Sequence, residues 1–105
     1  MPKYLITYHG AGAPETPEAA QRAMQAFGAW LASAGSAVVD PGAPLSVART
    51  VGQSGATDGQ TEGAIGGYTL LEAGDIAAAV KLVENHPYIG RGGKLQVSEA
   101  VDLGG

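Results

Sequence analysis

A strand, a tight turn and a capped helix follow one another between Gly66 and Pro87, and this βα unit constrains the fold more than any other stretch. Residues 68–73 alternate β-branched or aromatic residues with larger aliphatic ones, which is typical of a packed strand. A glycine then breaks the strand, and the Asp75 carboxylate can accept hydrogen bonds from the free amides of a new helix. Pro87 disfavours helical geometry at His86, so we expect the helix to end there.

Two helices carry apolar residues at helical spacing. In the helix of this βα unit, the buried stripe is predicted to consist of Ile76, Ala79, Val80 and Val83. A longer helix begins at Thr16, a hydroxyl cap followed by proline, and ends at Gly35. Its apolar stripe includes Ala20, Met24, Phe27, Trp30 and Leu31.

Four further stretches have the composition of strands: residues 3–9, 37–40, 45–51 and 94–101. Residues 41–44 are predicted to form a rigid proline turn, and residues 88–93 a glycine-rich turn. With one strand more between the helices, the order follows β-α-β-β-α-β, the ferredoxin-like pattern. We therefore expect an α+β fold, an antiparallel sheet with two helices on one face.

The chain of 105 residues is long enough for one domain, residues 1–105, and not for two. Two helices cover only one sheet face, yet apolar residues occur on both, as in residues 4–6, 38–39 and 70–71. An exposed apolar face of that size is rare in monomers. The sequence therefore predicts a homodimer in which two sheets pack face to face.

Composition excludes several classes of partner. The formal net charge of −4 argues against nucleic acid. No apolar run is long enough for a signal peptide or a membrane helix, so no membrane association is expected. The chain has no cysteine, which excludes disulfides and thiolate chemistry and fits a cytoplasmic protein.

Several motifs together cover most of the chain: KYLITYHG at the start, FGAWLASAG, DPGAPL, GGYTLLEAGDIAAAVKLVENHPY, and KLQVSEAV near the end. In this combination the sequence resembles the YciI-related, or DGPF-domain, family of dimeric α/β-barrel proteins. The resemblance implies a dimeric α/β barrel, and either an enzyme acting on a compact cyclic molecule or a partner of transcription regulators. The namesake motif keeps Asp58-Gly59, but Gln60-Thr61 replace its proline and phenylalanine. Met24 stands where some relatives carry the histidine of a proposed His–Asp dyad, so that assignment does not carry over.

Three polar residues are candidate catalytic groups. His9 ends the first strand beside a glycine loop, where an imidazole could act as a general base near neutral pH or simply be a strand-end residue. His86 is expected at a helix C-terminus, where the dipole favours the imidazolium; its alternative role is to cap the last carbonyls. Asp40 could orient a histidine, although an Asp-Pro pair more often begins a turn.

Ligand-binding candidates are Arg49, Tyr8 and Tyr88. Arg49 on an otherwise apolar strand face would suit an anionic ligand, unless a local bulge turns it outward. Tyr8 and Tyr88 could line an aromatic pocket together with Tyr68, although Tyr8 and Tyr68 also fit core positions. The Gly10-Ala-Gly12 loop is not a nucleotide fingerprint, because Glu15 would repel a pyrophosphate. Two histidines without a spaced carboxylate predict no metal site, and we expect no cofactor.

Three hypotheses for function remain open. The first is a cofactor-independent enzyme for a small cyclic or aromatic molecule, in which His9 and His86 transfer protons beside Asp40. The second is a ligand-binding or regulatory module that uses the same cleft without turnover, and the third is a structural dimer without a small-molecule site. Residues 52–66 are expected to be a glycine-rich mobile lid or a tolerated insertion, with Asp58 and Glu62 as solvated loop acids.

Overall fold

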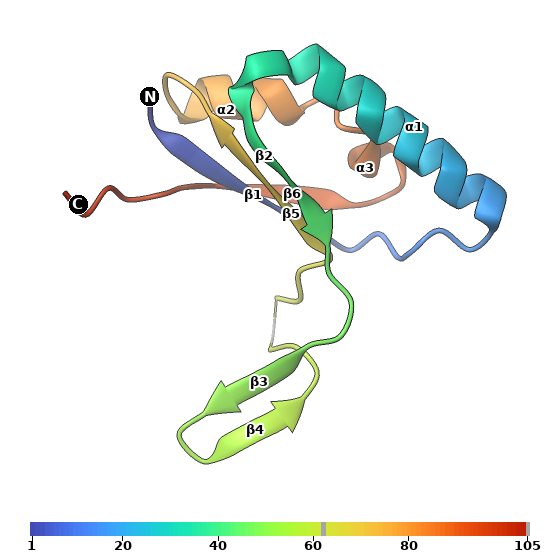
Figure 1. The fold of residues 1–105 in the computed structure, drawn as a ribbon, viewed down its shortest axis with the longest axis vertical. Helices are drawn as coiled ribbons and strands as arrows, with labels where there is room; N and C mark the ends of the chain where they lie inside the picture. Colours follow the sequence, from blue (N-terminus) through green and yellow to red (C-terminus); the bar gives the residue numbers. More distant parts are fainter. Residues whose placement is uncertain (62, 105) are drawn as a thin grey trace.

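The computed structural model describes residues 1–61 and 63–104. Figure 1 shows a sheet with the larger helices on one side of it and a hairpin that projects from its end. The elements are β1 (Lys3–His9), α1 (Pro17–Ala34), a 3-10 turn η1 (Gly35–Ala37), β2 (Val38–Pro44), β3 (Arg49–Gly52), β4 (Gly55–Asp58), β5 (Gly67–Glu72), α2 (Ile76–Val83), α3 (Pro87–Gly90) and β6 (Lys94–Glu99). This α+β architecture is compatible with the predicted ferredoxin-like fold.

The main sheet is antiparallel and has the strand order β2-β5-β1-β6. β1 is central: Tyr4 lies opposite Leu71 of β5, and Ile6 lies opposite Val97 of β6. Tyr4, Ile6 and Tyr8 alternate along β1 and are buried on one face. That face carries the core.

Both long helices cover this face. Trp30 of α1 and Val83 of α2 share one buried cluster with Ile6 and Leu71 of the sheet. The predicted caps are confirmed: the Thr16 hydroxyl accepts a hydrogen bond from the Ala19 amide at 3.0 Å, and Asp75 accepts from the Ala78 amide at 2.8 Å. The opposite sheet face has no helix over it (Figure 1), and Leu5 and Val39 are 37% and 43% exposed.

The predicted buried stripe of α2 was half wrong. Ala79 and Val83 are buried, but Ile76 and Val80 are 50% and 41% exposed. The small side chain of Ala79 packs in a cluster with Tyr4, so the helix presents this residue to the sheet and leaves Ile76 and Val80 partly exposed. The helix also ends at Val83, before the predicted end at the pre-proline residue.

Strand β2 continues through the segment that the sequence analysis assigned to a turn. Prolines are tolerated there because β2 is an edge strand, hydrogen-bonded only to β5. The pairing shifts register on both sides of Asp40. Gly42 has a φ of +74°, and a Cβ at this position would lie 1.8 Å from the Tyr68 carbonyl oxygen, so only glycine fits.

The predicted strand over residues 45–51 and the loop over residues 52–66 were wrong in arrangement. Only Arg49–Gly52 forms a strand, and it pairs with β4 rather than with the main sheet. Gly52 lies opposite Gly55, so β3 and β4 form a hairpin that projects away from the sheet and both helices (Figure 1). The polar segment pairs with itself because it offers no apolar face to the core. Glu62, one of the acids assigned to this loop, lies outside the described residues.

The last third of the chain differs in two details. The predicted turn after Pro87 is the one-turn helix α3, and β6 ends at Glu99 rather than at residue 101. Among the described residues, no helix has the length and apolarity needed to span a membrane.

Candidate functional site

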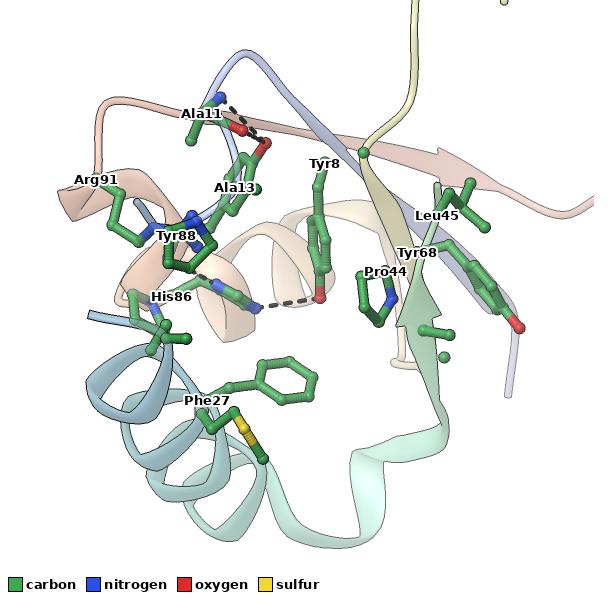
Figure 2. A pocket seen from close by; sticks show the side chains of 18 of the residues that line it. Tyr8, Ala11, Ala13, Phe27, Pro44, Leu45, Tyr68, His86, Tyr88 and Arg91 are labelled. Carbon is green, nitrogen blue, oxygen red and sulfur yellow. Dashed lines mark hydrogen bonds between the residues drawn. The ribbon is translucent and has the colours of Figure 1, made fainter. Parts of the chain in front are cut away.

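A cavity of about 490 Å³ lies on the helix side of the sheet. Its walls are mostly apolar and come from six segments: β1, the loop after β1, α1, the end of β2, the start of β5 with the glycine before it, and α3 with its flanking residues. The lining includes Tyr8, Ala11, Ala23, Met24, Phe27, Pro41, Pro44, Leu45, His86, Tyr88 and Arg91. Figure 2 shows the Tyr8 hydroxyl and the His86 ring pointing toward one another inside this space.

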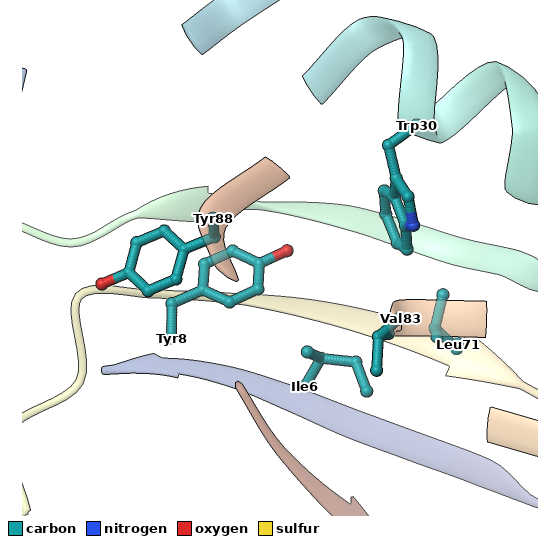
Figure 3. Close-up of a cluster of buried hydrophobic side chains, with 6 residues drawn as sticks. All are labelled: Ile6, Tyr8, Trp30, Leu71, Val83 and Tyr88. Atoms are coloured by element: carbon teal, nitrogen blue, oxygen red, sulfur yellow. The ribbon is translucent and has the colours of Figure 1, made fainter. Parts of the chain in front are cut away.

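His86 is enclosed by aromatic rings. Its centroid lies 4.5 Å from that of Trp30, 5.0 Å from Tyr8 and 5.6 Å from Phe27, and only 4% of the residue is exposed. Figure 3 shows Trp30 and Tyr8 within the same core. Burial disfavours the charged imidazolium and lowers the pKa of His86 to about 4, so the ring is neutral at neutral pH.

The expectation that a helix dipole would favour the charged form of His86 was wrong. The residue does not end α2; it is the N-cap of α3, and its Nδ1 accepts a hydrogen bond from the Tyr88 amide at 3.1 Å. An unprotonated Nδ1 is required for this bond, which therefore reinforces the neutral state.

A chain of four hydrogen bonds runs from this cap to β2. His86 Nε2 is 3.1 Å from the Tyr8 hydroxyl, which also bonds to the Thr69 hydroxyl, and Thr69 donates to the Pro41 carbonyl at 2.9 Å. The direction is fixed at both ends. Because the Pro41 carbonyl only accepts, the Thr69 proton points to it, so Thr69 must accept from Tyr8.

At the other end, the Tyr88 N–H occupies Nδ1, so the proton of the neutral His86 ring lies on Nε2 and points to Tyr8. All the protons in the chain therefore point from α3 toward Pro41. Both ring nitrogens of His86 are occupied, which leaves the ring without a free lone pair. Burial raises the pKa of the Tyr8 hydroxyl, so Tyr8 keeps the proton that it donates to Thr69.

Tyr88 closes the cavity on the side of the loop after β1. Its hydroxyl accepts from the Ala11 amide at 3.1 Å and donates to the Ala11 carbonyl at 3.0 Å. Arg91 donates from Nη2 to the Gly12 carbonyl at 2.7 Å, with its guanidinium 5.3 Å from the Tyr88 ring. A Cβ on Gly93 would lie 2.1 Å from that ring, so this glycine allows the ring to lie where it does.

His9 lies on the opposite face of the sheet from His86. Its Nδ1 donates to the Ala64 carbonyl at 2.9 Å, and its Nε2 is 2.8 Å from the Thr7 hydroxyl. Since the Ala64 carbonyl only accepts, Nδ1 of His9 carries a proton that points to it. His9 lines a second, shallower cavity of about 640 Å³ whose other walls include Leu5, Lys94 and Gln96.

The remaining predicted site residues lie away from the cavity's polar chain. Asp40 is exposed and accepts from the Gly42 amide at 2.9 Å, which is the turn-forming role considered as its alternative. Arg49 lies on the projecting hairpin, where its Nε is 3.4 Å from Asp58 Oδ1 and both side chains are largely exposed. The structure thus brings together Tyr8, Tyr88 and His86, and separates them from His9, Asp40 and Arg49.

Two site residues were missed from the sequence. Thr69 is buried completely and links the Tyr8 hydroxyl to the Pro41 carbonyl. Its only sequence signal is a hydroxyl on the apolar face of a strand, between Gly67 and Leu71. Arg91 had no signal, because it follows a helix that was expected to be a turn. Met24 lines the cavity from α1.

Within residues 1–61 and 63–104 there is no group of three His, Asp or Glu side chains placed to hold a metal ion. No family model and no curated protein matches the chain.

Proposed function

We propose that the protein is a small-molecule-binding module and that its ligand is a compact ring held in the 490 Å³ cavity. The observation that carries this proposal is the arrangement of the walls: mostly apolar and aromatic side chains surround the Tyr8 hydroxyl, whose hydrogen bond to His86 fixes its orientation. Cavities of this size and composition are typical sites for small ligands. Flat rings fit best, because Phe27, Pro44 and Met24 offer broad apolar contact.

Binding without turnover is favoured over proton transfer by the state of His86. A general base needs a free lone pair within reach of the substrate proton. Both ring nitrogens of His86 bond to protein groups, and burial holds the ring neutral. His9 and Asp40, the other proposed proton-transfer residues, lie outside this cavity. Loss of a detected turnover in His9→Ala and His86→Ala would restore the enzyme hypothesis.

A cavity-filling substitution tests the binding proposal. Ala23 lines the cavity from α1, and Ala26 lies exposed on the same helix. Ala23→Phe should abolish the binding of indole, indene and benzofuran, measured by calorimetry and ligand-detected NMR, because the new ring occupies their space. Ala26→Phe is the matched control and should leave binding unchanged. Equal affinity in both variants, or no binding of any of the three rings to the native protein, would contradict the proposal.

The proposed assembly is a homodimer formed through the helix-free sheet face. Leu5 and Val39 are exposed there, and Leu70, the β5 partner of Leu5, lies on the same face. A second copy offers the same apolar side chains, so a twofold interface would cover both sets. This arrangement leaves the ligand cavity, on the other face, accessible.

Membership of the YciI-related family is also a proposal. It is supported by the motifs along the chain and by the strand order, in which β5 and β6 flank β1. The dimeric barrel, the cytoplasmic location and a role beside transcription regulators are expectations that follow from this resemblance and from the lack of cysteine. A crystal structure of the assembled protein would test the barrel directly.

A further inference from the structure

The cavity contains an ordered polar group whose hydrogen-bonding capacity can be counted. The Tyr8 hydroxyl has one proton and two acceptor positions. Its proton goes to Thr69, and one acceptor position takes the His86 Nε2 proton. One acceptor position of the Tyr8 hydroxyl therefore stays free, whereas its proton is already used.

The group therefore presents only a lone pair to anything in the cavity. This polarity does not depend on the ligand, because it is set by two backbone groups at the ends of the chain. The Pro41 carbonyl accepts from Thr69, and the Tyr88 amide donates to His86. Reversal of the chain would put a proton on Nδ1 of His86, opposite the buried Tyr88 amide. An unpaired buried amide costs more than a neutral hydrogen bond gains.

We propose that the cavity selects a ring that carries an N–H or O–H donor and directs this donor to Tyr8 Oη, and that it discriminates against the same ring with an acceptor at that position. This inference rests on the proposed ligand-binding function and adds the polarity of the ligand to it. Thr69 is the positioning residue: it does not line the cavity, and it acts by taking the Tyr8 proton.

Three rings of nearly equal shape separate polarity from size. Indole has a donor and no comparable acceptor, benzofuran has an acceptor and no donor, and indene has neither. Indole should bind the native protein about 5- to 10-fold more tightly than benzofuran, the range expected for one neutral hydrogen bond. Indene should bind with an affinity close to that of benzofuran.

Thr69→Val tests the mechanism with little change in side-chain shape. Without the Thr69 oxygen, the Tyr8 proton becomes available to the cavity, so the preference for indole should disappear or reverse. Arg91 also offers donors, at another part of the wall (Figure 2), but benzofuran bound through Arg91 would not respond to Thr69. Thr69→Ser keeps the oxygen and should keep the native preference.

Thr7→Val is the matched control. It removes a buried threonine hydroxyl from the opposite face of the same sheet, where Thr7 bonds to His9. It should leave the affinity ratio at the native value, whatever it does to stability. The ratio is measured on folded protein, as judged by circular dichroism, so general destabilisation does not imitate the effect.

The outcomes distinguish the two proposals. If none of the three rings binds, the proposed function fails and the inference fails with it. If all three bind the native protein equally, or if Thr69→Val keeps the native preference, only the inference is overturned. The cavity would then bind rings without discriminating between hydrogen-bond donors and acceptors.

Discussion

The burial of a neutral His86 makes stability depend on pH in a defined window. The pKa falls from 6.5 in the unfolded chain to about 4 in the folded protein. The unfolded chain therefore binds more protons than the folded protein between these two values, and folding stability rises with pH across that interval. The contribution is fully present above about pH 6.5 and is lost as the pH falls toward 4.

The magnitude follows from the same two values. One pKa unit corresponds to about 1.4 kcal/mol, so the free energy of unfolding should fall by about 3 kcal/mol across the whole window. The side chain is almost completely enclosed, so solvent screening removes little of this. The cause of the lowered pKa is desolvation of the cation. A protonated Nδ1 would in addition no longer accept from the Tyr88 amide.

Urea unfolding at a series of pH values, compared with His86→Asn, isolates this contribution. Asparagine offers an oxygen to the Tyr88 amide but has no proton to gain in this range. The variant should be less stable near neutral pH, because it loses the aromatic contacts with Trp30 and Phe27. The difference between the two proteins should shrink as the pH falls below 6.5. A difference that stays constant, or an NMR titration of the His86 ring with a midpoint near 6.5, would refute the reasoning.

Three further predictions concern packing and assembly. Gly93→Ala should displace the Tyr88 ring and lower the free energy of unfolding by about 1–3 kcal/mol in urea denaturation. Gly90→Ala is the control, because an added Cβ there meets nothing within 4 Å, and it should not have this effect. Equal effects of the two substitutions would contradict the prediction. Replacement of residues 49–58 by a short glycine turn should change the free energy of unfolding by no more than about 0.5 kcal/mol, because β4 is exposed throughout. Loss of the folded state in this variant would show that the hairpin is needed for folding. Light scattering should give the mass of two chains for the native protein and of one chain for Leu5→Lys on the helix-free face; a single-chain mass for the native protein would defeat the proposed dimer.

The main elements were predictable because local signals and the fold agree. β1 has the predicted bounds, and both helix N-caps form the expected hydrogen bonds, since a hydroxyl or carboxylate ahead of an apolar run leaves few alternatives. The pairing of β3 with β4 was not predictable in this way. Weakly apolar strands carry little information about which neighbour they pair with, so residues 45–51 were predicted as one strand of the ferredoxin-like order and not as part of a separate hairpin.

The candidate site was predicted in part for a similar reason. Tyr8 was a candidate for an aromatic pocket or the core, and His86 was a candidate proton-transfer residue. The two do meet, although they are distant in sequence. Their roles depended on partners that no local pattern reveals. The buried rings around His86 decide its charge, and Thr69 decides the polarity of Tyr8. His9 and His86 were both proposed as proton-transfer residues, because sequence alone does not show that two histidines lie on opposite faces of one sheet.

The most direct test of the account is a crystal structure of the protein with indole bound. The account predicts that the ring occupies the cavity between Phe27 and Pro44, with its N–H directed to Tyr8 Oη and the four-bond chain unchanged. An empty cavity at saturating indole, or indole bound only on the sheet face beside His9, would contradict the central claim.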